Sequence, residues 1–292
     1  MSETSELTGT IERVEAPTRE EFTERWVRTN TPVILTGVGN RWPAFKRWSP
    51  QYFVEKAGDS EVTVHFDEDG NFFRWYQTGK GRVDRKMKVR ELMEILTREP
   101  AEHRYYVTEH EVRFISEELC KDLDYSRYLD AEDTDPLIFI GRDTFMPLHY
   151  HGTTEALLCQ VVGSKTVTLY SPDQFGLLSA RPWYANAPLF SRIDPRDPRA
   201  REVFPRFRDA QPLTFRLEAG EILFIPVHWW HVTRCPGFQL NVTCFWTASL
   251  KQYTYPEPAF QVFAREALWQ GKQRWKRLRG RLSAGGERAP AY

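Results

Sequence analysis

The clearest pattern along the chain begins near residue 104, where short apolar and β-branched runs alternate with turn residues. Runs of this length, bounded by Gly, Pro, Asn, Asp or Ser, are typical of strands. Many such strands in succession, with no long helical stretch between them, predict a β-barrel or a sandwich. The segments are RYYVTEHEV, LIFIGR, FMPLHYH, ALLCQVV, TVTLYS, LTFRLEAG, EILFIPV and LNVTCFW.

The first hundred residues have a mixed pattern instead. Helix signals occur in PTREEFTERWV, which has a Thr cap and early acidic residues, and in WPAFKRWSPQYFVEKAG, which contains a Ser-Pro start. TPVILTGV and residues 60–67 (SEVTVHFD) are predicted strands, and residues 86–97 (KMKVRELMEILT) are a predicted amphipathic helix. We therefore expect an α+β lobe over residues 1–100, packed on a β core over residues 101–250.

Two further segments depart from the strand pattern. Residues 175–211 are dense in Arg, Pro and Asp, and Pro removes the hydrogen-bond donors that a sheet needs. This insertion is either a lid or binding loop or a solvated excursion, and the pattern does not decide between them. Residues 251–292 contain a helical pattern with a basic end and a polar tail. Its Ala, Phe and Trp stripe is expected to dock on the core or on a partner subunit, as in a homodimer.

Composition and charge exclude several classes of function. The 292 residues are 41% hydrophobic, which suits one large globular unit. Lys plus Arg equals Asp plus Glu at 40 each, so no net charge attracts the protein to nucleic acid or to an acidic membrane. The basic end of the predicted C-terminal helix has a simpler explanation, because cations at a helix C-terminus complement the helix dipole. We expect neither a nucleic-acid nor a membrane partner. Without a signal peptide or an apolar run near ~20 residues, and with four widely spaced cysteines, the expected location is the cytoplasm.

The candidate chemistry lies in two histidine clusters. His149 and His151 occur in PLHYHGTTEALL, and residues two apart on a strand point to the same face. The turn at Gly152 would let Glu155 swing back toward the two imidazoles. His231 ends FIPVHWWH, where a buried strand terminates at Pro, and His228 is expected on the outer face or behind the ligands. Imidazoles with a carboxylate suit Fe(II), Mn(II), Zn or Cu(II). We predict His149, His151, Glu155 and His231 as metal ligands.

Lys165 is unusual because it is a charged residue on the aliphatic face of a predicted strand. In KTVTLYS it shares a face with Val167 and Leu169, so an aliphatic face turned to the barrel interior would carry the lysine inward. An inward ammonium is costly unless an anion meets it, which predicts a carboxylate-bearing ligand near the metal. The alternative is that Lys165 lies at the strand mouth and reaches water.

These phrases together resemble a known superfamily. HYHGTTEALLCQVVG and GEILFIPVHWWH are similar to the two cupin motifs, and the set from TPVILTGVGNRWPAFKRW to LEAGEILFIPVHWWH resembles the JmjC-type, cupin-like hydroxylases over roughly residues 20 to 250. The resemblance implies a double-stranded β-helix (jelly-roll) core with an α+β N-terminal lobe and C-terminal helices. It also implies an oxygenase that uses iron(II), 2-oxoglutarate and O₂ to hydroxylate a peptide, a protein side chain or a small natural product.

By position, the resemblance makes His149 and His231 the first and last metal ligands, and Lys165 and Tyr106 the residues that bind 2-oxoglutarate. Two positions depart from the family pattern: His151 stands where Asp or Glu is usual, and Met146 where Thr or Ser is common. Thr144, on the same face, is the substitute. The alternative is a cupin dioxygenase or isomerase with a three-His-one-Glu site that does not use 2-oxoglutarate.

Overall fold

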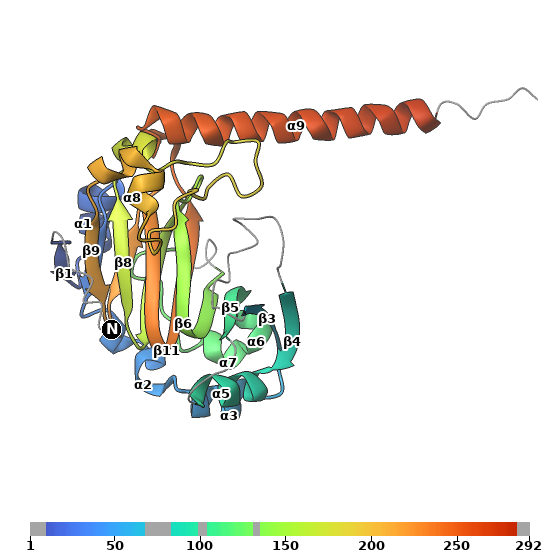
Figure 1. The fold of residues 1–292 in the computed structure, drawn as a ribbon. Coiled ribbons are helices and arrows are strands. Elements are labelled where there is room, and N and C mark those ends of the chain that lie inside the picture. Colours follow the sequence, from blue (N-terminus) through green and yellow to red (C-terminus); the bar gives the residue numbers. More distant parts are fainter. Residues whose placement is uncertain (1–9, 68–82, 99–103, 131–134, 285–292) are drawn as a thin grey trace, which may run out of the picture.

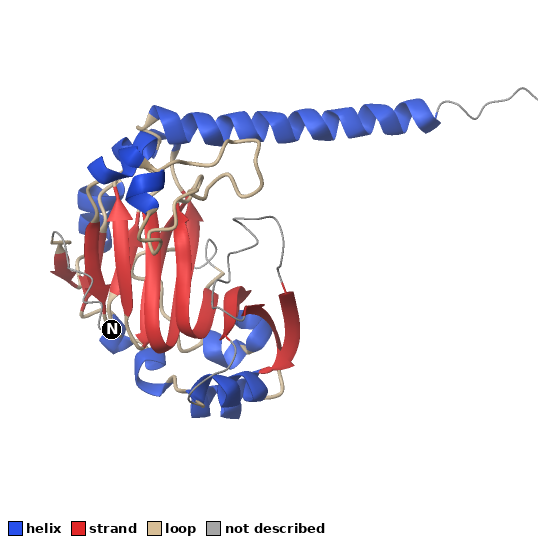
Figure 2. Ribbon diagram, in the orientation of Figure 1, coloured by secondary structure: helices blue, strands red, loops and turns tan. Residues whose placement is uncertain are grey.

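The fold is a jelly roll whose strands form one connected network of hydrogen-bonded pairs. The computed structural model describes residues 10–67, 83–98, 104–130 and 135–284. In these residues the sheet order is β1-β2-β10-β7-β11-β6-β5-β3-β4, and β8 pairs with both β11 and β9. Figures 1 and 2 show the strands gathered in one body. The strands are β1 (Arg13–Glu15), β2 (Val33–Thr36), β3 (Glu61–Asp67), β4 (Val83–Lys88), β5 (Arg104–Glu111), β6 (Leu137–His149), β7 (Thr154–Val162), β8 (Lys165–Tyr170), β9 (Leu213–Leu217), β10 (Ile222–Ile225) and β11 (Trp230–Thr247).

The long strand β11 joins the two halves of the jelly roll. Its first residues, 230–234, pair with β8, and its last residues, 240–247, pair with β7, while β6 runs beside both parts. Apolar side chains of β8 and β9 are buried together with those of β7, β10 and β2. The two halves therefore face each other, and the space between them is the barrel interior.

Two predicted segments fuse into the single strand β6. LIFIGR and FMPLHYH were expected as separate strands, but the chain stays paired with β11 through an irregularity between Cys235 and Phe238. Asp143 adopts a left-handed φ of 51° there, and its carboxylate accepts a hydrogen bond of 2.8 Å from the Gly237 amide. A bulge of this kind bends a strand without ending it. The ladder hydrogen bonds thus continue where the sequence pattern shows a break.

The N-terminal helices cover the outer face of one half. The predicted caps are present, because Thr18 accepts a hydrogen bond from Glu21 and Ser49 from Tyr52. Residues 86–88, predicted as helix, instead extend β4, where they pair with β3. A large apolar cluster joins these helices to the sheet. The helices are α1 (Arg19–Phe22), continued by a π-helical turn over Thr23–Val27, and α2 (Pro43–Arg47), α3 (Pro50–Ala57), α5 (Val89–Thr97), α6 (Val112–Ile115) and α7 (Glu117–Cys120).

The insertion at residues 175–211 covers the outer face of the other half. Phe175, Leu178 and Phe207 are buried in one cluster with Tyr170 of β8 and Trp230 of β11. The insertion contains the short helix α8 (Ala200–Val203). Of the two readings left open by the sequence, a purely solvated excursion is therefore wrong, since this segment supplies a second apolar core.

The chain continues into the long helix α9 (Pro256–Ala284), which extends away from the sheets in Figure 1. Its first turns pack on the β6–β7 connection, because a Cβ placed on Gly152 would lie 3.0 Å from Val262. Among the described helices, none combines the length and the apolar character that a membrane span requires. The phenyl rings of Phe260 and Phe263 and the indole of Trp269 remain exposed.

Candidate metal centre

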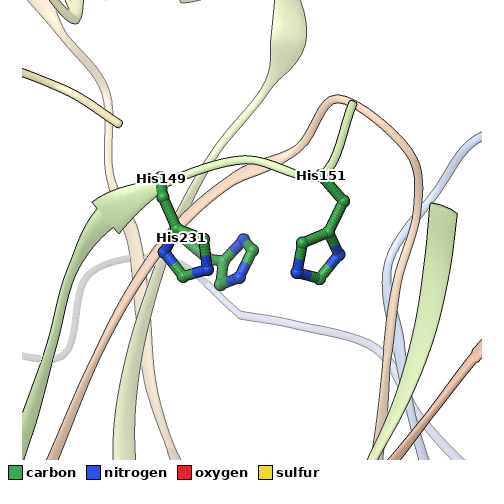
Figure 3. Close-up of side chains that lie close together, drawn as sticks. All are labelled: His149, His151 and His231. Carbon is green, nitrogen blue, oxygen red and sulfur yellow. The ribbon is translucent and has the colours of Figure 1, made fainter. Parts of the chain in front are cut away.

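Three histidines converge at one end of the barrel interior. His149 is the last residue of β6, His231 is the second residue of β11, and these two are directly paired across the ladder. His151 follows two residues after β6, and Figure 3 shows its ring turned toward the other two. One ring nitrogen from each histidine lies within 4.8 Å of the others. This spacing allows all three to bind a single metal ion.

Backbone hydrogen bonds set the tautomers of two of these rings. His149 Nδ1 lies 2.8 Å from the Pro147 carbonyl, and His231 Nδ1 lies 3.1 Å from the Trp229 carbonyl. Because a carbonyl oxygen can only accept, each Nδ1 carries the hydrogen and each Nε2 keeps a lone pair. His151 Nδ1 is buried and has no hydrogen-bond partner among the described residues. An orphaned buried nitrogen beside two oriented imidazoles fits a metal ion.

Burial keeps the three rings neutral. Loss of solvent lowers the pKa of His149 to about 4 and that of His151 to about 3. Burial also lowers the pKa of His231 well below its usual range, and the neighbouring His149 and His151 add to this effect. Neutral imidazole is the form that binds divalent metals. The donor set therefore fits a divalent first-row metal such as Fe(II).

The structure does not bring the fourth predicted ligand, Glu155, to this cluster. On β7, Ala156 and Leu158 line the barrel interior, so Glu155 points to the opposite face. Its carboxylate is buried and accepts a 2.7 Å hydrogen bond from the Gln252 side chain. The prediction relied on a turn that would swing Glu155 back, but β7 begins at Thr154 and the strand alternation directs the side chain away.

A small inner cavity of about 50 Å³ extends from the histidines to Lys165. The ammonium of Lys165 is buried and donates a 2.6 Å hydrogen bond to Asn241 Oδ1, and burial lowers its pKa. The structure thus places this amine in the interior and not at a solvated strand mouth. An amide partner leaves the positive charge uncompensated, so an anion in this cavity would meet it.

Of the two remaining predicted residues, one lines this cavity and the other lies behind it. Tyr106 lines it, and burial raises the pKa of its phenol well above the usual range. Thr144 is buried but lines neither this cavity nor the larger one described next; it hydrogen-bonds to Tyr106. The prediction that Thr144 contacts a cosubstrate is therefore not supported by its position, and any influence it has would pass through Tyr106.

A larger outer cavity of about 420 Å³ opens on the other side of His149 and His151. The insertion forms part of its wall: Leu189 and Phe190 line it, and the Phe190 ring stacks on His149 with centroids 5.0 Å apart. Phe245 of β11 packs edge-on against His151 at 5.1 Å. Aromatic rings therefore pack against two of the predicted ligands and restrict the orientation of their imidazoles.

His228 supports the cluster from outside, which agrees with its predicted place. It is fully buried with a left-handed φ of 69°, and its Nε2 lies 3.1 Å from the Gly152 carbonyl. Its ring contacts Tyr253 at 4.9 Å between centroids. His228 therefore contacts both Gly152, the residue after His151, and Tyr253, which precedes α9.

Sequence reasoning missed several residues that the structure places in these cavities, among them three polar ones. Asn241 pairs with Lys165, and Thr243 lines the inner cavity beside it. Their alternation with Leu240, Val242 and Cys244 was a usable signal, since polar residues occupy one face of an otherwise apolar strand. Glu109 lines both cavities, and no comparable pattern marks it.

Comparisons with known proteins indicate the family of the chain. A family model described as a cupin-like domain matches residues 18–252. Lysine-specific demethylase 8 of Xenopus tropicalis is 28% identical over 245 residues, covering 81% of this chain and 53% of that protein. JmjC domain-containing protein E of Dictyostelium discoideum is 26% identical over 272 residues, covering 76% of this chain and 77% of that protein.

A third relative, tRNA wybutosine-synthesizing protein 5 of Gallus gallus, is 26% identical over 259 residues, covering 81% of this chain and 76% of that protein. The chain spans about half the length of the demethylase, so that protein includes a substantial part with no counterpart in the match.

Proposed function

The chain belongs to the JmjC-type, cupin-like domain family, and from this premise we propose that it is a metal-dependent oxygenase that uses iron(II) and 2-oxoglutarate to hydroxylate a C–H bond. One observation carries the proposal: three neutral histidines stand at one end of the inner cavity and the uncompensated ammonium of Lys165 stands at the other. A dicarboxylate could bind the metal with one end and Lys165 with the other.

His149, His151 and His231 would hold the iron, and the backbone carbonyls bonded to two of them would keep their lone pairs oriented. When bound, iron(II) together with 2-oxoglutarate and O₂ supplies the oxidising chemistry that inserts oxygen into a C–H bond and releases succinate and CO₂. Lys165 and Tyr106 would bind and orient the distal carboxylate. Phe190 and Phe245 would form an aromatic wall of the outer cavity beside His149 and His151, where the substrate would bind.

The position of Glu155 supports this proposal. A site with four protein ligands would leave only two open positions on a six-coordinate metal, too few for a bidentate cosubstrate and O₂ together. Because Glu155 faces away from the cluster, three protein ligands remain, and three positions stay open. Three neutral ligands also leave the full charge of a divalent ion, which favours an anionic cosubstrate.

A second candidate function rests on the identity of the third ligand. His151 replaces the carboxylate that the family usually has, and the described cluster contains only imidazoles. The second candidate is therefore an all-imidazole metal site that carries out oxygen chemistry without 2-oxoglutarate. In that case Lys165 would bind an acidic group of the substrate itself.

The substrate class remains part of the proposal. The relatives are named for a lysine-specific demethylation and for a tRNA modification, so their names point to different substrates. We propose a peptide, a protein side chain or a small natural product. We also propose that the exposed aromatic stripe of α9, with Phe260 and Phe263, pairs with the same helix of a second copy.

An anaerobic titration tests the function directly. The protein is loaded with one equivalent of iron(II), and 2-oxoglutarate is added while the visible absorbance is followed for a metal-to-ligand charge-transfer band. The proposal predicts a saturable band, followed by O₂-dependent release of succinate. Stoichiometric metal binding with O₂ consumption but no band and no succinate would favour the second candidate. Failure to bind metal would overturn both.

A further inference from the structure

The insertion contains a groove of about 550 Å³ that is separate from the two cavities beside the histidines. None of the described residues that line the groove also lines one of those cavities. The charged residues in its wall are Arg181, Arg192, Asp194 and Asp197, and the rest of the described wall is apolar. The groove therefore has a chemistry of its own, which does not depend on the metal centre.

A short hairpin fixes the backbone of both arginines. On either side of an antiparallel bridge, the Arg181 amide donates a 3.0 Å hydrogen bond to the Phe190 carbonyl, and the Arg192 amide donates one of 3.0 Å to the Ser179 carbonyl. Phe190 also forms a bridge with His149 and stacks on its ring, so the hairpin is anchored to the end of β6. The two guanidinium groups therefore extend from a backbone that is ordered before a ligand binds.

These two guanidinium groups repel each other and have no carboxylate partner. Within the described part of the chain, no ion pair joins Arg181 or Arg192 to an acid. Arg181 Nε is buried and has no hydrogen-bond partner among the described residues. Burial lowers the pKa of the Arg181 guanidinium, and the positive charge of Arg192 lowers it further. An anion bound to both groups would offset the repulsion and satisfy the buried donor.

The two carboxylates in the wall already have partners of their own. Asp194 forms a bidentate pair with the Arg196 side chain at 2.8 and 3.0 Å, and the Arg196 guanidinium also lies 3.8 Å from the centroid of the Phe145 ring. Asp197 accepts a 2.9 Å hydrogen bond from the Arg199 amide and forms an ion pair with that side chain at 3.6 Å. Neither Arg196 nor Arg199 lines the groove. The unpaired charge in the groove is therefore positive.

The apolar part of the wall adds a second requirement for the ligand. The guanidinium carbon of Arg192 lies 5.9 Å from the centroid of the Phe204 ring, a cation–π contact that orients the charged group. Pro182 and Val203 line the groove together with Phe204. A small inorganic anion would leave this apolar surface in water, whereas the organic part of a larger ligand would cover it.

We propose that Arg181 and Arg192 bind the phosphate group of an organic phosphate monoester, whose organic part packs on Pro182, Val203 and Phe204. Arginine binds phosphate through paired N–H donors in a planar fork. A phosphate monoester has close to two negative charges at pH 7 and three acceptor oxygens, which match two guanidinium groups. A carboxylate or a phosphodiester has one charge and would leave one guanidinium uncompensated. The site goes beyond the proposed function, because it uses neither the metal nor 2-oxoglutarate.

Calorimetry with matched anions tests the site. The full chain is loaded with Mn(II) and saturated with 2-oxoglutarate, so that the metal and Lys165 are not open to the probes. Phenyl phosphate is the monoester, methyl phenyl phosphate and phenylacetate are the singly charged analogues, and inorganic phosphate lacks the organic part. We expect phenyl phosphate to bind about tenfold more tightly than each of the other three. Adenosine 5′-monophosphate and N-acetyl-phosphoserine methylamide then show whether a nucleotide or a phosphorylated side chain is preferred.

Variants assign the binding to residues. Arg181→Gln should weaken phenyl phosphate binding about tenfold, and Arg192→Gln roughly threefold to tenfold, because Arg192 is the more exposed of the two. Arg181→Lys keeps the charge but not the planar fork, so it should fold like the parent and bind the monoester about threefold more weakly. Arg201→Gln removes the same charge from an exposed arginine of α8 outside the groove, and this matched control should bind like the parent.

Three outcomes would overturn the inference: the parent binds none of the monoesters, it binds the diester as tightly as the monoester, or both glutamine variants keep the parent's affinity. His231→Ala, which removes a metal ligand but no residue of the groove, separates this site from the proposed function. Phenyl phosphate should bind this variant as it binds the parent. Loss of binding in His231→Ala would place the phosphate at the metal centre and would also overturn the inference.

Discussion

His149 lies directly across from His231 in the antiparallel pair of β6 and β11, with ring centroids 4.0 Å apart. The two ligands are thus joined by the register of a ladder that also forms the barrel. A one-residue slip would turn one imidazole to the opposite face, so the register that buries the core also assembles the metal centre.

Replacing either paired histidine should therefore abolish metal binding. For His149→Ala and His231→Ala we expect metal content, measured by mass spectrometry after dialysis against Fe(II) or Mn(II), to fall below roughly a tenth of the parent's value, because two imidazoles retain metals far more weakly than three. His110→Ala, on β5 and outside both cavities, is the control and should bind metal fully. Full occupancy in either ligand variant would contradict the assignment.

Replacing Glu155 should leave the metal in place. In Glu155→Gln the amide can keep the hydrogen bond from Gln252, and no ligand is lost, because the carboxylate faces away from the three histidines. Metal content equal to the parent's is the expected result. A loss comparable to that of His149→Ala would show that Glu155 does reach the metal.

The same residue should make stability depend on pH. Burial raises the pKa of the Glu155 carboxyl from its ordinary 4.5 to about 7, against hydrogen bonds from Gln252 and Trp246 that lower it. The folded state therefore binds this proton more tightly than the unfolded state. The free energy of unfolding should fall as pH rises from 4.5 to about 7, by about 3 kcal/mol at most, and then level off.

Urea unfolding of the parent and Glu155→Gln at several pH values measures this contribution. The variant should lack it and gain stability relative to the parent at pH 8, although other titrating groups affect both proteins alike. If the difference between the two proteins does not change across this range, the buried carboxyl does not titrate as described.

Lys165 should control cosubstrate binding without affecting the metal. Lys165→Met keeps the aliphatic stem but removes the charged group that donates a hydrogen bond to Asn241. We expect 2-oxoglutarate to bind about 30- to 1000-fold more weakly, equivalent to about 2 to 4 kcal/mol, with metal content unchanged. Asn241→Asp should also weaken binding, because an internal carboxylate would neutralise the ammonium. Unchanged affinity in Lys165→Met would remove the main support for 2-oxoglutarate.

Helix α9 should control the oligomeric state. Phe260 is 63% exposed and Phe263 is 54% exposed, so pairing of two copies would bury both rings. Light scattering coupled to size exclusion should show a dimer for the parent and a monomer for Phe260→Glu and Phe263→Glu. Leu250→Glu changes an exposed apolar residue outside the helix and should remain dimeric. A monomeric parent would exclude this interface.

Local patterns were enough to predict a large part of this protein. The alternation of apolar residues marked the strands of the jelly roll, and the two-residue spacing of His149 and His151 placed both rings on one side. The same alternation put Lys165 with Val167 and Leu169, and all three side chains are buried. These features depend on neighbours within a few residues, so the sequence by itself contains them.

The tertiary structure decided which way Glu155 points and which residues meet across strands. From Ala156 to Cys159 β7 is buried and apolar on both faces, so no polar alternation reveals its orientation there, and only pairing with β10 and β11 sets it. His65 and Thr108 are 43 residues apart and meet only because β3 and β5 are adjacent and β5 bulges. Contacts of that kind follow from register, which a single sequence does not specify.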